Sequence, residues 1–172
     1  MINIEIKAKC SEPNRIRKML NSKGVDFKGT DRQIDTYFKV KTGRLKLREG
    51  NIENGLIYYE RENTNLPKQS NYLLYRTNPH TKLKDFLKED FEILTVVDKQ
   101  REIYFIENVK FHIDTVENLG SFIEIEATDD GGKIEKDVLE KQCRYYISLF
   151  GIEVNDLISC SYSDMIMESL VN

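Results

Sequence analysis

The sequence predicts an α+β fold in which about eight antiparallel strands close into a β-barrel and helices pack outside it. Each predicted strand alternates apolar with charged residues and so has one apolar and one charged face. An open antiparallel sheet with its charges in water would show the same alternation. Closure is favoured because the charged faces separate by sign along the chain, and because helices with apolar stripes are available to cover the outer, apolar side.

We expect a single domain over residues 1–172, long enough to bury a core without disulfides. The three cysteines are widely spaced and form neither a zinc motif nor a disulfide framework. No apolar run approaches the roughly 20 residues of a membrane span, and the N-terminus lacks the apolar core of a signal peptide. We therefore expect a cytoplasmic protein that does not bind membranes. The net charge of −3 argues against nonspecific nucleic-acid binding, but it allows a local basic cavity.

The first half of the chain is predicted to hold five strands and two helices. Residues 2–10 form the first strand, and a helix follows with Ser11 as its candidate N-cap and Gly24 at its end. The other strands are predicted over residues 32–40, 44–49, 56–62 and 72–77. Residues 63–70 are predicted to be a loop, and a short amphipathic helix is predicted near residues 83–87.

The second half follows the same plan. Residues 91–105 are predicted to form one long strand or two short ones, and residues 109–116 and 120–127 form two more. Apolar residues at helical spacing predict a helix over 133–150, and a last short helix is expected near 161–170.

The strand over residues 120–127 carries two acids on one face. Glu124 and Glu126 lie one strand repeat apart, which places them roughly 7 Å from each other. Both carboxylates are therefore able to reach one divalent cation or two adjacent ones. A surface strand with a solvated acidic face is the ordinary alternative, but other strands repeat the design with bases in place of acids.

Closing the sheet would turn a mixed set of charges inward. The predicted inward bases are Lys7, Lys9, Lys46, Arg48, Arg61, Arg76, Lys99 and Arg101, and the predicted inward acids are Glu5, Asp114, Glu124 and Glu126. Burying this set, with its net charge of +4 (eight bases, four acids), would be costly without a ligand. A polyanion that carries its own Mg²⁺ or Mn²⁺ would offset this cost for the bases and for the acids. Lys and Arg would neutralise its phosphate oxygens, and the carboxylates would bind its cation. The pattern therefore favours a metal-bound phosphate chain.

Several segments in order resemble the CYTH superfamily, the triphosphate tunnel metalloenzymes. Asn3-x-Glu5-x-Lys7 resembles the Glu-x-Glu-x-Lys signature of that superfamily. Six supporting segments follow in the order of the family: Asp35-Thr-Tyr-Phe, Arg44-Leu-Lys-Leu-Arg-Glu, Lys99-Gln-Arg-Glu-Ile-Tyr, Asp114 followed by Leu119-Gly120, Phe122-x-Glu124-x-Glu126, and Tyr162-Ser-Asp. Each motif alone is weak, but together they cover essentially the whole chain.

The resemblance implies an eight-stranded antiparallel tunnel that holds one or two Mg²⁺ or Mn²⁺ ions and grips a triphosphate. It implies that Glu5, Asp114, Glu124 and Glu126 bind metal. It also implies that Lys7, Lys46, Arg48, Lys99 and Arg101 bind phosphate. The assignment of the same role to Lys9, Arg61 and Arg76 depends on strand parity as much as on the motifs. Lys7, Arg48 and Arg101 are the candidate catalytic residues among these bases. Asn3 stands where the signature has its first Glu, which puts the second metal ion in doubt.

Several further residues have two readings. His112 shares a face with Asp114, but we expect it to be structural or on the surface. Tyr37 and Tyr59 are expected to pack in the barrel wall, and Asp35 to orient a basic neighbour. Tyr162 would either help the last helix to close one mouth of the tunnel or simply pack.

Two reactions fit the predicted site. In the favoured one, water attacks the terminal phosphorus of a triphosphate, as in thiamine triphosphatase; in the other, a ribose 3′-hydroxyl attacks the α-phosphorus of ATP, as in class IV adenylyl cyclases. A non-catalytic module that binds polyphosphate or nucleotide is a third possibility. The expected partner is a small-molecule triphosphate such as ATP or tripolyphosphate, and the protein is expected to be a monomer or a homodimer.

Overall fold

The computed structural model describes residues 2–61, 67–129 and 131–171, which form an α+β fold of eight strands and four α-helices. The strands are β1 (Ile2–Lys9), β2 (Asp26–Phe38), β3 (Arg44–Glu49), β4 (Gly55–Arg61), β5 (Lys68–Arg76), β6 (Ile93–Ile106), β7 (Val109–Val116) and β8 (Gly120–Asp129). The helices are α1 (Pro13–Ser22), α2 (Leu83–Asp90), α3 (Lys136–Phe150) and α4 (Tyr162–Ser169), with a 3₁₀ turn at Val154–Asp156. The predicted α+β class is confirmed.

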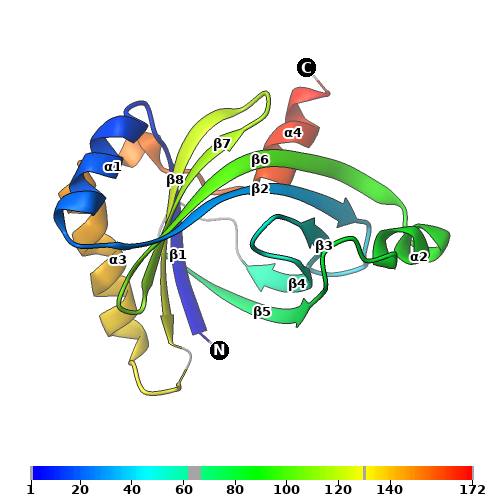
Figure 1. Cartoon of the computed structure of the whole chain (residues 1–172), viewed down its shortest axis with the longest axis horizontal. Helices are drawn as coiled ribbons and strands as arrows, with labels where there is room; N and C mark the ends of the chain where they lie inside the picture. The colour runs from blue at the N-terminus through cyan, green and yellow to red at the C-terminus, as the bar shows by residue number, and fades with distance from the viewer. Residues whose placement is uncertain (1, 62–66, 130, 172) are drawn as a thin grey trace.

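All eight strands belong to one antiparallel sheet, in the order β1-β5-β4-β3-β2-β6-β7-β8, with β1 and β8 also paired. The sheet is therefore strongly curled (Figure 1). Its ladders differ in length, since β1 pairs with β8 through all eight of its residues but with β5 through three pairs, from Asn3–Ser70 to Glu5–Lys68. The predicted closure of the sheet thus depends on the short seam between β1 and β5.

Helices α1 and α3 lie together on one flank of the sheet, over β1, β7 and β8 (Figure 1). They cover the apolar residues that alternate with the charged ones on these strands. Phe111 of β7 is fully buried between the rings of Tyr146 and Phe150 on α3, with ring centroids 4.6 and 5.7 Å away. Each such side chain contributes about 1.5–3 kcal/mol by leaving water. This burial fixes which faces of β1, β7 and β8 point inward.

Helix α4 closes one end of the curled sheet. Beneath it, Val97, Val116, Phe122 and Tyr162 are buried together and form an apolar plug inside the sheet. Ser161 caps α4 by accepting a hydrogen bond from the backbone N–H of Asp164 at 3.1 Å. The plug confines the charged part of the interior to the remaining length of the sheet.

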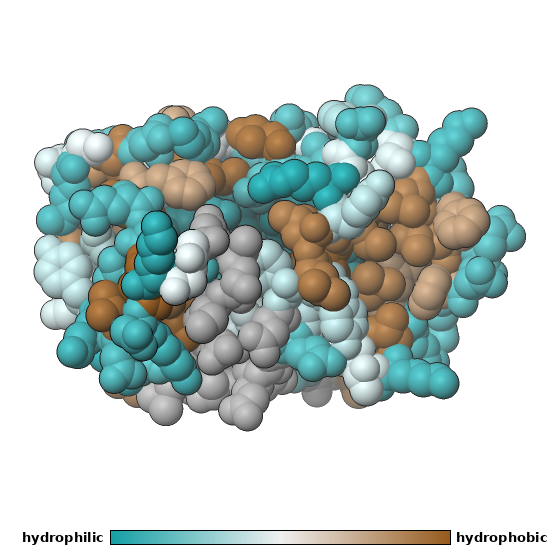
Figure 2. All heavy atoms as spheres, turned by 90° about the horizontal axis from the view of Figure 1, so that it is seen from below, coloured by the Kyte–Doolittle hydropathy of each residue, from teal (hydrophilic) through white to brown (hydrophobic). Residues whose placement is uncertain are grey.

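The opposite flank is less covered. Helix α2 packs through Leu87 on Phe38 and Leu47, next to β2 and β3. Beyond it, Leu73 and Tyr75 on β5 are largely exposed. Figure 2 shows apolar side chains gathering at the end of the molecule that carries α2. The outer faces of β4 and β5 therefore lack the helical layer that covers β1, β7 and β8.

Three features differ from the sequence prediction, and one predicted alternative is decided. Strand β2 begins at Asp26, because its first residues pair with β6 in spite of their polarity, around an irregularity at Gly29 where φ is +127°. Residues 68–70, predicted to be a loop, belong to β5, whereas residues 62–66 of that loop lie outside the described residues. Residues 93–106 form one continuous strand. Glu12, and not Ser11, is the N-cap of α1.

None of the helices in the described ranges is both long enough and apolar enough to span a membrane.

Candidate active site

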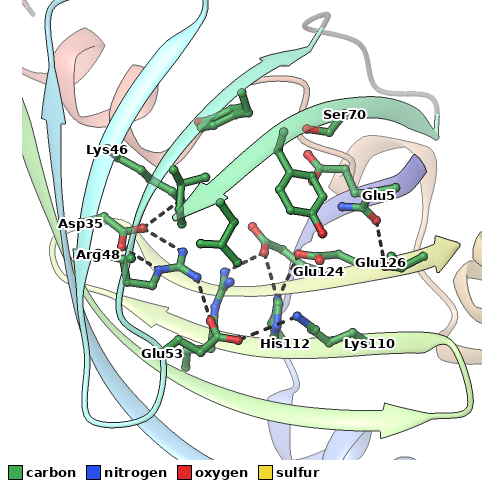
Figure 3. Close-up of a pocket in the computed structure, with 18 of the residues that line it drawn as sticks. Glu5, Asp35, Lys46, Arg48, Glu53, Ser70, Lys110, His112, Glu124 and Glu126 are labelled. Atoms are coloured by element: carbon green, nitrogen blue, oxygen red, sulfur yellow. Dashed lines mark hydrogen bonds and ion pairs between the residues drawn. The ribbon is translucent and has the colours of Figure 1, made fainter. Parts of the chain in front are cut away.

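A cavity of about 900 Å³ lies inside the curled sheet, and all eight strands contribute side chains to it. Alternate residues point inward, as the predicted parity requires: Lys99 and Arg101 on β6, Lys46 and Arg48 on β3, and Glu124 and Glu126 on β8. Figure 3 shows Lys46 and Arg48 around Asp35 on one side of this cavity, and Glu5, Glu124 and Glu126 on the other. The predicted separation of charge by sign is therefore present only in part, because acids lie among the bases and bases among the acids.

The basic side is organised around the carboxylate of Asp35. This carboxylate accepts hydrogen bonds from Lys46 (3.0 Å), Arg48 (2.9 and 3.0 Å) and Lys99 (2.7 Å), and together we call these four residues the basic cluster. Asp35 is 1% exposed, and burial alone would raise its pKa. The three cations, Arg48 foremost, instead hold that pKa well below its ordinary value. Asp35 was expected to orient a basic neighbour, and it contacts three.

Lys99 is the most deeply buried base of this cluster. Burial lowers its pKa to about 7, because removal from water disfavours the ammonium, and the nearby Arg48 adds repulsion. Asp35 opposes this shift without cancelling it. Lys99 therefore changes charge near neutral pH unless another anion comes close to it.

Arg101 joins the basic and acidic sides. Its guanidinium donates to both oxygens of Asp114 (2.7 and 2.5 Å) and to Glu124 (2.7 Å). Tyr162 also donates to Asp114, at 2.8 Å. Asp114 is fully buried and is not among the described residues that line the cavity. Asp114 therefore holds the Arg101 guanidinium from the side that faces away from the cavity. Its predicted role as a metal ligand stays a prediction.

The acidic side brings Glu124 and Glu126 together with His112, and we call these three residues the acidic cluster. One possible ligand atom from each lies within 4.8 Å of the others. Burial would raise the pKa of Glu124, but Arg101 and Lys7 hold it well below its ordinary value. The pKa of Glu126 is lowered to about 2, against the effect of burial, chiefly by His112. Both glutamates are therefore carboxylates at neutral pH, with oxygens suited to a hard cation.

Glu5 stands beside this cluster. It lies directly opposite Glu126 in the ladder between β1 and β8, and Lys7 on the same strand forms an ion pair with Glu124 at 3.0 Å. Figure 3 shows Glu5, Glu124 and Glu126 along the same part of the cavity. Three of the four predicted metal-binding acids thus lie near one another.

Glu53 is a site residue that sequence reasoning missed. It lies in the loop between β3 and β4, where the fully buried Asp31 accepts three backbone N–H groups, those of Asn51 (2.6 Å), Ile52 (2.9 Å) and Glu53 (2.9 Å). The Glu53 carboxylate reaches Arg48 at 2.8 Å and Lys110 at 3.8 Å. Strand parity does not apply to a loop residue, so the sequence carried no signal for it.

Lys110 was also missed as a part of the site, and His112 was expected to be structural or on the surface. Both line the cavity from β7, and His112 is 2% exposed with its Nδ1 near both glutamates. The surface alternative for His112 is therefore wrong. Its shared parity with Asp114 was the available signal, and Lys110 shares that parity too.

The remaining predicted bases lie at the edges of the cavity or outside it. Arg76 is exposed and lines the cavity. Lys9 is exposed and is not among the described lining residues, because it pairs with Phe122 at the level of the apolar plug. The side chain of Arg61 lies outside the described residues. Eight bases and seven acids line the described cavity, so its net charge is +1 and not +4 with His112 neutral.

One part of the cavity wall is uncharged. Ile57 and Tyr59 on β4 and Tyr72 and Leu74 on β5 point inward next to the basic cluster. Tyr59 is buried beside Tyr37, as expected for wall packing, and the ammonium of Lys46 lies 5.7 Å from the centre of its ring. The cavity therefore offers apolar and aromatic contacts as well as charged ones.

A curled antiparallel sheet around a charged cavity is an architecture that this chain shares with a known family. The family model of the CYTH domain matches residues 1–156, and the chain belongs to that family. A Methanocaldococcus jannaschii protein, provisionally named an adenylate cyclase, is 25% identical over 96% of this chain and 98% of its own length.

Two solved structures are similar in fold. A protein of Pyrococcus horikoshii superposes with a TM-score of 0.80 at 23% identity, covering 94% of this chain and 98% of its own. A protein from Hippeastrum, described as an adenylyl cyclase candidate with a dominant triphosphatase activity, superposes with a TM-score of 0.61 at 12% identity, covering 97% of this chain and 95% of its own.

Proposed function

We propose that this protein is a divalent-metal-dependent enzyme that hydrolyses a triphosphate inside its curled sheet. One observation carries the proposal: a cavity of about 900 Å³ in which a cluster of buried and half-buried cations faces a cluster of half-buried carboxylates. A triphosphate with a bound divalent cation complements both sides at once. The family supports this class of substrate, and the dominant triphosphatase activity named for the Hippeastrum protein supports hydrolysis.

The cation would be held by the acids. Glu5, Glu124 and Glu126 offer carboxylate oxygens on neighbouring strands, which fit the oxygen preference of Mg²⁺ and Mn²⁺. Asp114 belongs to the predicted set, but its present contacts support a role in positioning Arg101. When bound, the cation would neutralise phosphate oxygens and make the phosphorus easier to attack.

The basic side would bind the phosphate chain. Lys46, Arg48 and Lys99 already converge on one carboxylate, so they are arranged to donate to a set of anionic oxygens. Lys7 contacts one carboxylate oxygen of Glu124 and Arg101 contacts the other, so both bases lie beside the predicted cation site. We propose that Lys7, Arg48 and Arg101 stabilise the charge that develops as the terminal P–O bond breaks.

The uncharged wall formed by Ile57, Tyr59, Tyr72 and Leu74 supports an organic group on the triphosphate, which inorganic tripolyphosphate would lack. The same wall favours the second candidate, an adenylyl cyclase, because a nucleobase would fit against it. The name of the Methanocaldococcus jannaschii relative agrees with this candidate. In that reaction the ribose 3′-oxygen would bond to the α-phosphorus and pyrophosphate would leave.

The test is to identify the products. Purified protein with Mg²⁺ or Mn²⁺ would be offered ATP and tripolyphosphate separately, and phosphate, pyrophosphate and cyclic AMP would be resolved. We expect phosphate release without cyclic AMP. Cyclic AMP with matching pyrophosphate would replace hydrolysis by cyclisation, whereas tight binding with no product would leave a binding module.

A further inference from the structure

His112 occupies an unusual position in the acidic cluster. It lies directly opposite Glu124 in the ladder between β7 and β8, and its Nδ1 is 3.3 Å from Oε2 of Glu124 and 3.4 Å from Oε1 of Glu126. The other ring nitrogen, Nε2, is buried and has no hydrogen-bond partner among the residues that the structure describes. Figure 3 shows the ring between the two glutamates and the Glu53–Lys110 ion pair. Two anionic oxygens thus converge on one ring nitrogen.

No protonation state of the imidazole satisfies this arrangement. With a proton on Nδ1, a single N–H faces two carboxylates at distances longer than the usual 2.9 Å or so of an N–H···O bond. With Nδ1 unprotonated, its lone pair faces both carboxylates. With both nitrogens protonated, the single N–H at Nδ1 is still shared by two carboxylates, 3.3 and 3.4 Å away. A cation that accepts the Nδ1 lone pair and both carboxylates would satisfy all three groups at once.

The distances fit a metal ion. Ligand atoms about 2.1–2.2 Å from one ion, at right angles to each other, lie roughly 3.0 Å apart. The two separations at Nδ1 are slightly longer than this, and one atom from each of the three residues falls within 4.8 Å. The two separations at Nδ1 thus exceed those of ligand atoms sharing one ion by only a few tenths of an ångström.

We propose that His112 is itself a metal ligand, and that with Glu124 and Glu126 it forms a one-histidine, two-carboxylate site. An imidazole nitrogen suits Mn²⁺ better than Mg²⁺, which takes oxygen ligands. The site therefore selects Mn²⁺ over Mg²⁺. This inference rests on the metal requirement of the proposed function, but it concerns a ligand that the acids alone do not provide.

The chain is well suited to a direct test, because it contains two histidines and the other, His80, is exposed in the turn between β5 and α2. Mn²⁺ added to the full chain would be examined by pulsed electron paramagnetic resonance for coupling to nitrogen. We expect a ¹⁴N coupling that changes to ¹⁵N in protein labelled at histidine. The variant H80Q should keep this coupling.

The variant H112N keeps an N–H group where Nδ1 stands but removes the imidazole. We expect it to lose the coupling and to bind Mn²⁺ at least ~10-fold more weakly, with a smaller change for Mg²⁺. If H112N does not fold, as judged by circular dichroism, the labelling experiment on the unsubstituted protein decides alone.

The outcomes separate the two proposals. Stoichiometric Mn²⁺ without a histidine coupling would overturn the role of His112 and leave the proposed function standing. Failure to bind Mn²⁺ or Mg²⁺ at millimolar concentration would overturn both.

Discussion

The two sides of the cavity are both densely charged, but they are balanced in different ways. The basic cluster carries its own counter-ion, since Lys46, Arg48 and Lys99 share the buried carboxylate of Asp35. The acidic cluster has cations at Glu124, but Nδ1 of His112 meets two carboxylates, and its Nε2 has no hydrogen-bond partner among the described residues. The basic side thus holds its counter-ion without a ligand, whereas the acidic side is where we propose that a cation binds.

This difference indicates how binding is arranged. Under the proposed function, the cations would need little reorganisation to bind phosphate, because Asp35 already holds their side chains in place. The acidic side would gain its counter-charge together with the substrate. The four predictions that follow test this contrast, beginning with the largest expected effect.

Removing the internal counter-ion of the basic cluster should have the largest effect. In D35N, the buried Arg48 and Lys99 and the half-buried Lys46 lose their shared carboxylate, and loss of one partner from a buried ion pair costs about 3–5 kcal/mol. We expect thermal or urea unfolding to show a loss of this order, with part of it recovered when tripolyphosphate is added. D98N is the matched control, because Asp98 pairs with the exposed Arg32 and should cost less than about 1 kcal/mol. An equal loss in both variants would contradict the special role of Asp35.

On the acidic side, the corresponding substitution should spare folding and abolish chemistry. E126Q keeps the size of the side chain but removes one carboxylate charge from the acidic cluster. We expect turnover to fall at least ~100-fold, a loss typical of an electrostatic catalytic group. Binding of tripolyphosphate without metal should be equal or tighter, because one repulsive charge is gone. E117Q, at an exposed position outside the cavity, is the control. A parallel loss of binding and turnover would show that Glu126 acts through the fold.

The contrast also explains what could be predicted from the sequence. Strand parity placed Lys46, Arg48, Lys99, Arg101, Glu124 and Glu126 on the cavity wall, because alternation along a strand depends on local geometry alone. The eight-stranded antiparallel sheet followed from the same alternation. These are the features that each strand specifies by itself.

The features that were missed depend on how the strands are assembled. Lys9 has the inward parity but lies level with the apolar plug, whose position is set by α4. Glu53 reaches the cavity because Asp31 on another strand holds its loop through three backbone N–H groups. His112 has the right parity, but its role depends on the register of β7 against β8, which places it opposite Glu124. Register and loop position are properties of the whole sheet, so local alternation does not encode them.

Lys99 gives the basic side a pH dependence that the acidic side lacks. Its pKa in the folded protein is about 7, so above this pH the ammonium must be recharged before it binds phosphate. A phosphate chain only gains negative charge as the pH rises, so a fall in affinity would have to come from the protein. Between pH 7.5 and 9 we therefore expect the affinity for tripolyphosphate to fall by up to about tenfold per pH unit.

The free energy of unfolding should change with pH in the opposite direction to the affinity. An unfolded Lys keeps its proton up to about pH 10.4, so between pH 7 and 10 the unfolded state binds more protons. The contribution of Lys99 to stability thus rises with pH while the affinity falls. K99R, whose charge is permanent, should bind with little pH dependence over this range. A wild-type affinity that is flat from pH 7.5 to 9 would contradict a lowered pKa of Lys99.

The smallest expected effect lies where the two sides meet. Glu53 is a fixed carboxylate between Arg48 and Lys110, and its side chain is 28% exposed. In E53Q both cations lose a competing anion, and for a partly exposed pair this is worth about 0.5–1 kcal/mol. We expect titration calorimetry to show tripolyphosphate binding about 2- to 5-fold tighter, with the gain shrinking as salt is added. E49Q, which loses only the ion pair to Lys84 outside the cavity, should leave affinity unchanged. Weaker binding in E53Q would mean that Glu53 serves mainly to hold Arg48 in its binding position, which would make it a second internal counter-ion of the basic side.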